Sequence, residues 1–260
     1  MTISFLQQLL ALASGVLVGF SLGVVGGGGS VLAVPLMVYV VGVPAAHIAI
    51  GTSAVAVAVN AAINLLGHAR RGNVRWACAL VFAGAGVVGA LMGSAVGKTI
   101  DGNKLLTLFA VVMFLIAVLM FRSRSHVGHS AVRISWSNFP VLSVLGLATG
   151  ALSGFFGIGG GFLIVPALMW GTGMSILCAV GSSLVAVTAF GAATAVSYAW
   201  SDLIVWTIAG LFIAGGVVGG LLGGMLATRL ASQRGKLNTL FAIVIMTVAV
   251  YMYVRSVGSL

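Results

Sequence analysis

The stretch Gly23-Val24-Val25-Gly26-Gly27-Gly28-Gly29-Ser30-Val31-Leu32-Ala33-Val34-Pro35 decides how this chain folds, because it returns as Gly154-Phe155-Phe156-Gly157-Ile158-Gly159-Gly160-Gly161-Phe162-Leu163-Ile164-Val165-Pro166. Both copies lie in strongly apolar sequence. A glycine run ends a helix, and a helix that ends within hydrocarbon leaves backbone groups unpaired unless protein or a water-filled cavity covers them. The repeat therefore predicts one covered helix break in each half of the chain.

The composition excludes a soluble protein. Of 260 residues, 61% are hydrophobic and 5% are charged, and the mean hydropathy is +1.24. The apolar runs are continuous and about 20 residues long, which is the length of a membrane-spanning helix rather than of the alternating strands of a β-barrel. We therefore expect an all-α polytopic membrane protein, and the lipid bilayer is its first partner.

The charge is strongly positive, with twelve Lys or Arg, two Asp and a formal net charge of +10. The basic residues lie in short loops between apolar runs, so they indicate topology and not a nucleic-acid partner. Cys78 and Cys178 both lie in apolar stretches, where a thiol packs as a small hydrophobic group. The N-terminus has no basic region and no cleavage site, so we expect its first segment to remain as a membrane helix.

The duplication extends beyond the glycine runs. Gly51-Thr52-Ser53 matches Gly181-Ser182-Ser183, and Trp76 matches Trp206. The sequence therefore predicts one transporter domain made of two membrane repeats, 1–121 and 134–260, joined by a cytoplasmic linker, 122–133. Each repeat has five apolar segments, at 3–25, 30–43, 45–67, 77–97 and 105–121 in the first and at 138–156, 161–173, 175–199, 203–228 and 237–254 in the second. The second segment of each repeat is too short to span a bilayer and is predicted to be a half-helix or re-entrant helix.

Basic residues favour an inverted repeat. Loop 70–75 has three arginines, whereas the matching loop around Asp202 has none. Placing loop 70–75, the linker and loop 229–236 in the cytoplasm puts nine basic residues inside and three outside. A parallel repeat would put matching loops on one side and lose this bias. The inverted arrangement has an odd number of crossings per half and both termini outside.

The glycine runs are the candidate anion site. The first N–H groups of a helix that starts there have no partner within the helix, and the helix dipole adds to their attraction for an anion. With inverted halves, two such helix starts are expected to meet near the midplane. The alternative is close helix packing, which we expect for Gly84, Gly86, Gly89, Gly93, Gly215, Gly216, Gly219, Gly220, Gly223 and Gly224.

Hydroxyl side chains follow each break at matching positions and can donate hydrogen bonds to a small oxyanion, or bond back to their own helix. The predicted substrate-binding residues are therefore Gly26, Gly27, Gly28, Gly29, Ser30, Thr52, Ser53, Gly157, Gly159, Gly160, Gly161, Ser182 and Ser183.

Asn60 and Asn64 lie four residues apart in an apolar run and either line the pathway or bridge helices. His47 is a candidate for proton coupling or an interfacial histidine. Asp101 and Asp202 fall in predicted loops and there is no glutamate, which argues against a carboxylate proton relay and a cation or metal substrate. We predict no catalytic residues, no metal site and no cofactor.

The doubled glycine motif, each copy followed by Gly-Thr/Ser-Ser, resembles the TauE/SafE family of sulfite and organosulfonate exporters over nearly the whole chain. The resemblance implies a bacterial inner-membrane transporter of sulfur oxyanions, sulfonates or related carboxylates. Ile158 interrupts the second glycine run, which makes the two motifs unequal. The alternatives left open are a passive anion channel and a membrane-embedded enzyme. Substrate, direction of transport, coupling ion and a homo-oligomeric state are also left open.

Overall fold

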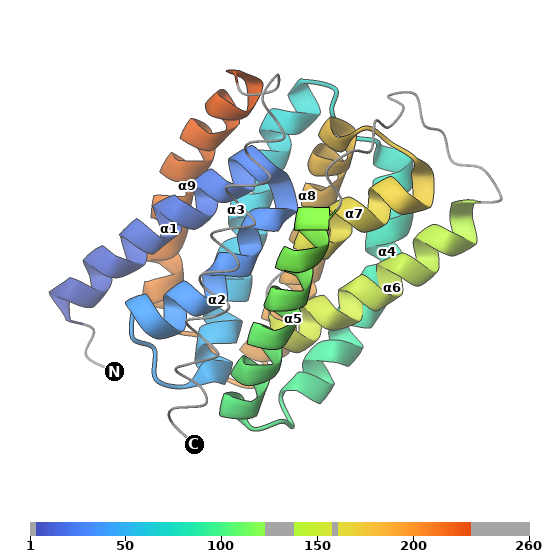
Figure 1. Ribbon diagram of the computed structural model, residues 1–260. Coiled ribbons are helices and arrows are strands. Elements are labelled where there is room, and N and C mark those ends of the chain that lie inside the picture. Colours follow the sequence, from blue (N-terminus) through green and yellow to red (C-terminus); the bar gives the residue numbers. More distant parts are fainter. Residues whose placement is uncertain (1–3, 123–137, 158–160, 230–260) are drawn as a thin grey trace.

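The computed structural model describes residues 4–122, 138–157 and 161–229, which are almost entirely helical (Figure 1). In chain order the elements are α1 (Phe5–Val25), η1 (Gly26–Leu32), α2 (Ala33–Pro35), η2 (Leu36–Val40), α3 (Ala46–Arg70), α4 (Trp76–Gly97), α5 (Gly102–Arg122), α6 (Asn138–Phe156), α7 (Gly161–Thr172), α8 (Ile176–Ala199) and α9 (Trp206–Arg229).

Six of these helices, α1, α3, α4, α6, α8 and α9, are long and apolar enough to cross a membrane. The prediction of an all-α polytopic membrane protein is therefore confirmed. The predicted segments agree with the helix ends to within a few residues, although α3 continues to Arg70 instead of ending at residue 67. The last predicted segment, 237–254, and the linker beyond Arg122 lie outside the described residues.

Each half begins with a helical hairpin. At Gly26 the chain leaves α1 with φ +70° and enters a 3₁₀-helix, so the glycines themselves are helical and the break is a single residue. A Cβ on Gly42, just after η2, would lie 3.9 Å from the side-chain nitrogen of Gln7 at the start of α1. The short helical segment η1–α2–η2 thus returns to the end of the bundle from which α1 started (Figure 1).

The second half repeats this hairpin with α6 and α7. Gly157 has φ +67°, and Gly171 near the end of α7 lies against Val141, Leu142 and Leu145 near the start of α6. The prediction of short helices after the glycine runs is therefore confirmed. Proline lies in each short helix, at Pro35 before the π-helical turn η2 and at Pro166 inside α7. A proline removes one N–H donor from a helix, which explains why these segments are irregular and short.

Small residues let the first helix of each half pack on the fourth helix of the other half. Gly15, Gly19 and Gly23 of α1 lie against the backbone of α9 at Phe212, Gly216 and Gly220. In the same way Gly146, Gly150 and Gly154 of α6 lie against the backbone of α4 at Phe82, Gly86 and Ala90. The two crossings use matching positions, so the duplication in the sequence is also a duplication of packing.

The prediction that ten further glycines serve close packing holds for eight of them. Gly84 is an exception, because a Cβ there would meet nothing within 4 Å, and Gly224 is another, because its nearest neighbour is the Arg71 guanidinium at 3.8 Å. A glycine in an apolar helix therefore marks a close contact only where its face of the helix meets another helix.

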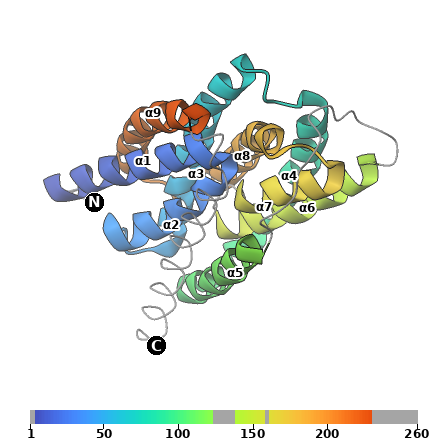
Figure 2. The same ribbon diagram turned by 45° about the horizontal axis from the view of Figure 1, so that its top comes forward.

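Helices α3 and α8 form the centre of the bundle, between the α1–α9 pair and the α4–α6 pair (Figure 2). The Arg75 N–H, just before α4, donates to Ser182 near the start of α8 (2.9 Å). The Val205 N–H, just before α9, donates to Thr52 near the start of α3 (3.0 Å). Because α4 follows the end of α3, the end of α3 lies at the start of α8, and these two equivalent helices run antiparallel.

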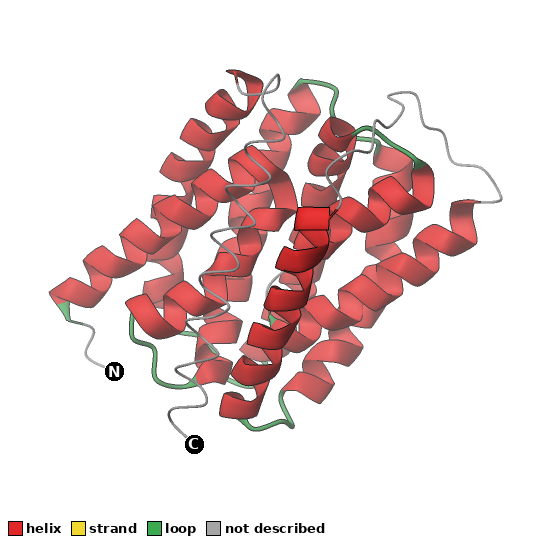
Figure 3. Ribbon diagram, viewed as in Figure 1, coloured by secondary structure: helices red, strands yellow, loops and turns green. Residues whose placement is uncertain are grey.

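The connections gather at the two ends of the molecule (Figure 3). The α3–α4 connection lies at the end where α9 finishes, together with Arg70, Arg71 and Arg75, whereas the α8–α9 connection lies at the opposite end with Asp202 (Figure 1). This arrangement is the one that the inverted-repeat prediction requires. Which end faces the cytoplasm remains a prediction.

Two glycines on α4 separate packing from helix propensity. Gly89→Ala should lower the thermal stability of the purified protein, by about 1–3 kcal/mol, because a Cβ there collides with the backbone at Leu147 and Ala151. Gly84→Ala, in open space, should be neutral or stabilising by up to about 1 kcal/mol, because alanine favours helix. Equal thermal unfolding of the two variants would contradict the close crossing of α4 and α6.

Candidate functional site

Each helix break packs against the third helix of the other half. A Cβ on Gly26 would lie 2.7 Å from a methyl group of Val180 and 2.8 Å from the Val180 carbonyl oxygen, both on α8. A Cβ on Gly157 would collide with the side chain of Ile50 on α3. Both glycines have positive φ, which a side chain disfavours. Glycine is therefore required at both breaks for two independent reasons.

The two breaks do not meet at one point. Val180 is the fifth residue of α8 and Ile50 the fifth of α3. Because α3 and α8 run antiparallel, the break at Gly26 lies toward one end of this pair and the break at Gly157 toward the other. The short helices η1 and α7, which follow the two breaks, contact each other. The expectation that their starts meet near the midplane of the membrane stays a prediction.

A serine of the second half organises the first break. The Gly27 N–H donates to Ser183 Oγ (3.1 Å), and the Ser183 hydroxyl donates to the Val180 carbonyl (2.8 Å). Ser30 Oγ donates to the Gly27 carbonyl (2.8 Å). Ser30 and Ser183 are both fully buried. The structure thus brings together three of the predicted site residues, and it gives one of the unpaired N–H groups a protein partner.

The second break is described only in part. Ser53, which matches Ser183, donates to the Ile50 carbonyl (3.0 Å). The side chain of Ile50 in turn lies against Gly157. Gly159 and Gly160 lie outside the described residues, and Gly161 begins α7. Gly28 and Gly29 belong to η1, where Gly29 is packed against the backbone of Ser21 and Leu22.

Thr52 and Ser182 do not lie with their neighbours at the breaks. Their hydroxyls accept the N–H groups of Val205 and Arg75, the residues that precede α9 and α4. These bonds hold the start of one half's fourth helix on the other half's third helix. The described contacts of Thr52 and Ser182 are thus structural, and a role as substrate donors stays a prediction.

Asn60 and Asn64 lie where α3 meets the α1–α9 crossing. A Cβ on Gly216 would collide with the Asn60 amide, and one on Gly220 would lie 2.6 Å from the Asn64 amide nitrogen. Asn64 also donates to the Asn60 carbonyl (2.9 Å). Both are buried, and among the described residues neither amide atom of Asn60 has a hydrogen-bond partner. The hydrogen bond of Asn64 lies within α3, so neither residue is shown to bond across helices, and their role as bridge or pathway residues stays a prediction.

The predicted and the missed histidine lie at opposite ends of α3. His47 is half-buried in the first turn, and His68 is 3% exposed in the last turn. Sequence analysis missed His68 because it ended the third segment at residue 67. The signal was present, since residues 60, 64 and 68 lie four apart and so share one helix face.

The remaining polar and reactive groups have simple positions. Asp101 caps α5 by accepting the N–H groups of Asn103 (3.0 Å) and Lys104 (3.3 Å). Cys78 and Cys178 are free and buried. Among the described residues, no three His, Cys, Asp or Glu side chains lie close enough to hold a metal ion.

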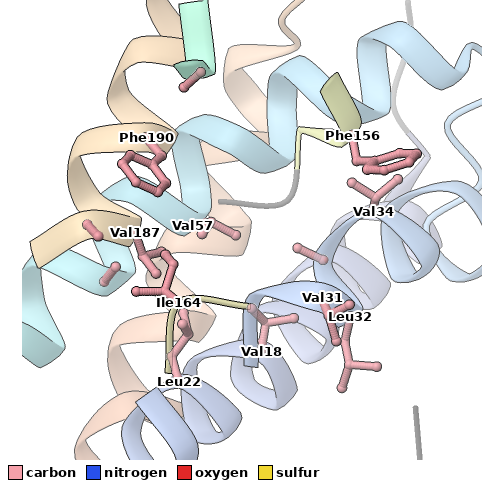
Figure 4. Packing of buried hydrophobic residues seen from close by; sticks show 14 of the residues in the cluster. Val18, Leu22, Val31, Leu32, Val34, Val57, Phe156, Ile164, Val187 and Phe190 are labelled. Carbon is pink, nitrogen blue, oxygen red and sulfur yellow. The ribbon is translucent and has the colours of Figure 1, made fainter. Parts of the chain in front are cut away.

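A fully apolar cluster surrounds the short helices. It joins Val31 and Leu32 of η1, Ile164 of α7, Val57 of α3 and Val187 of α8. Figure 4 shows Ile164 pointing toward α1 side chains of the same cluster. The residues of the first break and the side chains between the two breaks are thus buried in this conformation.

The helical bundle, with two buried helix breaks and antiparallel third helices α3 and α8, is typical of polytopic membrane transporters. The chain matches the family described as sulfite exporter TauE/SafE over residues 11–252. It belongs to that family.

Relatives from three organisms support this membership. A probable membrane transporter protein of Xylella fastidiosa is 50% identical over 97% of both chains. The probable membrane transporter protein YdhB of Bacillus subtilis is 29% identical over 70% of this chain and 75% of its own. A probable membrane transporter protein of Methanocaldococcus jannaschii is 32% identical over 62% of this chain and 63% of its own. No solved structure matches the chain.

Two glycines with the same backbone conformation separate strain from crowding at the second break. Gly157→Ala should abolish transport and lower the yield of folded protein, because a Cβ there meets Ile50 in addition to the unfavourable φ. Gly173→Ala, at φ +70° with nothing within 4 Å, should cost only about 1–2 kcal/mol and keep activity. Size-exclusion profiles and uptake assays measure both effects. An active, well-folded Gly157→Ala variant would show that the break does not need to approach α3.

Proposed function

We propose that this protein is a secondary transporter of a small anion, with sulfite, an organosulfonate or a related sulfur oxyanion as substrate. The observation that supports this proposal most strongly is the first break, where the glycine backbone, a serine hydroxyl and the start of a helix lie together and buried. Neutral N–H and O–H donors of this kind bind oxyanions in proteins without a fixed cation.

The chemistry of the break favours an anion over other ligands. Transfer of an isolated anion into an apolar interior is very costly unless hydrogen-bond donors replace its water. At Gly26–Gly29 the backbone bears no side chains, so a ligand can approach the N–H groups closely. The Ser183 hydroxyl donates to the Val180 carbonyl, but it can rotate toward an anion that replaces Ser183 Oγ as the acceptor of the Gly27 N–H. Substrate and hydroxyl thus compete for the same N–H group.

Burial favours a transporter over a passive channel. Ser30, Ser183, Val57 and Val187 all have exposed fractions of 0%. A channel needs a continuous polar route in its conducting state, whereas a transporter closes over its site. Two hairpins that lie side by side, each held by the other half, suit a mechanism in which the halves move relative to each other and expose the breaks in turn.

We infer that the halves are inverted repeats in a bacterial inner membrane, with the Arg70–Arg75 end in the cytoplasm. The positive-inside rule supports this orientation, because that end has Arg70, Arg71 and Arg75 and the opposite end has Lys98, Lys104 and both aspartates. Trp76 is 49% and Trp206 65% exposed at the first positions of α4 and α9, where a tryptophan suits a membrane interface.

Labelling of two matched positions tests the orientation. Gly72 and Asp202 occupy equivalent turns and have positive φ, at 71° and 54°. In a background with Cys78→Ala and Cys178→Ala, we expect Gly72→Cys to react with an impermeant maleimide only after the cytoplasmic face is opened. Asp202→Cys should react in intact cells. Reaction of both cysteines from one side would contradict inverted repeats.

Calorimetry on purified protein tests the anion site. Sulfite or a small sulfonate should bind, and a neutral sulfone of similar size should not, because only an anion gains from the helix starts. Ser183→Ala should weaken binding of the anion by about 1–3 kcal/mol, because it removes the hydroxyl that can turn toward the ligand beside the Gly27 N–H. Ser143→Ala, which removes a similar bond to the Phe139 carbonyl far from the breaks, is the matched control and should bind normally. Equal binding of the sulfone or of a divalent cation would exclude the anion site.

A further inference from the structure

Three polar side chains form a line along α3 that the fold does not explain. Asn60, Asn64 and His68 share one helix face, and the line covers about 12 Å of the helix. All three are more than nine-tenths buried, at 0%, 8% and 3% exposure. Among the described residues neither amide atom of Asn60 has a hydrogen-bond partner, and the only partner near the His68 ring is the backbone of Gly23. A buried polar atom without a hydrogen bond destabilises the fold by a few kcal/mol, so we expect a bound water molecule here.

The line reaches the first break. The His68 imidazole lies beside the backbone of Gly23, three residues before the break at Gly26, and Asn64 lies against Gly23 as well. A neutral imidazole has one donor and one acceptor, and an amide has both, so these groups offer a water molecule the several partners it needs. His68 is also in the last turn of α3, close to the end of the bundle where Arg71 lies.

The second half has different groups at these positions. The residues that match Asn60, Asn64 and His68 are Phe190, Thr194 and Tyr198. The hydroxyls of Thr194 and Tyr198 are also buried without a partner among the described residues. A hydroxyl or a phenol does not take up a proton near neutral pH, and a phenylalanine interrupts the polar route. The asymmetry therefore gives one break, and not the other, a group that can bind and release a proton.

We propose that His68 is the proton-binding group that couples anion movement to a proton, with Asn64 and Asn60 holding the water that reaches it. This inference rests on the proposed anion transport. A proton from the aqueous phase adds to the free ring nitrogen and gives the imidazolium while the anion occupies the neighbouring break. The same proton leaves to water after the anion is released, so no other bond forms or breaks. The proton offsets the charge of the anion during the passage.

The described elements around His68 carry few ionisable side chains. Arg71 lies nearby on the same helix end, and Arg75 lies just before α4, where its N–H bonds to α8. Helix α1 has no ionisable side chain, α9 has Arg229 at its last position, and α8 has the buried thiol Cys178 near its start. Among the described residues, His68 is the one imidazole near this break.

A first experiment needs no substrate. The full chain, with ¹³C-labelled histidine and reconstituted in nanodiscs, is titrated by NMR, and the His68 signal is identified by its absence in His68→Gln. We expect that signal to move reversibly as the pH is lowered from about 8 to about 4, because the proposed water brings protons to the buried ring. A His68 signal that does not move over this range overturns the proposal.

A second experiment separates coupling from transport. In proteoliposomes loaded with a pH-sensitive dye, sulfite or a sulfonate should enter with protons in the wild type. His68→Gln should keep anion exchange at equal pH but lose proton entry and uptake driven by a pH gradient, whereas Tyr198→Phe, at the matched position of the second half, should keep all three. Unchanged proton entry in His68→Gln overturns coupling at this residue. Absence of any anion movement in the wild type would instead reject the proposed function, and the NMR titration would still decide whether His68 binds a proton.

Discussion

A helix that breaks inside an apolar protein must find partners for its unpaired backbone N–H and C=O groups, and this requirement governs how the two halves pack. At Gly26 the chain reverses through a single residue with positive φ, and the N–H group that follows it is bound by Ser183 of the other half. At Gly157 the same reversal packs on Ile50. Neither half covers its own break. Duplication therefore makes two incomplete units that complete each other.

The glycine crossings place these units. Helix α1 lies on α9 and α6 on α4 with backbone against backbone, and this close approach brings the third helices α3 and α8 together in the centre. Bonds from the N–H groups of Arg75 and Val205 then tie each fourth helix to the opposite half. These contacts across the halves hold α3 and α8 in the centre, where each packs on the break of the other half.

Much of this architecture could be predicted from the sequence, because hydropathy sets the length of apolar helices and glycine runs end them. The spans, the short helices and most packing glycines were identified in this way. The relative position of the two breaks could not be predicted, because it depends on where Gly26 and Gly157 lie along the antiparallel helices α8 and α3. Thr52 and Ser182 share a motif with the serines at the breaks, but the turn of the helix points them to other partners. His68 was missed because helix ends are read from sequence to within only a few residues.

The central claim is that an anion binds at the glycine breaks, and a high-resolution structure of the protein soaked with a sulfonate tests it most directly. We expect density for the sulfonate beside the backbone N–H groups of Gly26–Gly29 and near Ser183, with the Gly27 N–H donating to the ligand instead of to Ser183 Oγ. Density confined to the Lys98 end of the bundle, with both breaks unchanged and closed, would contradict it.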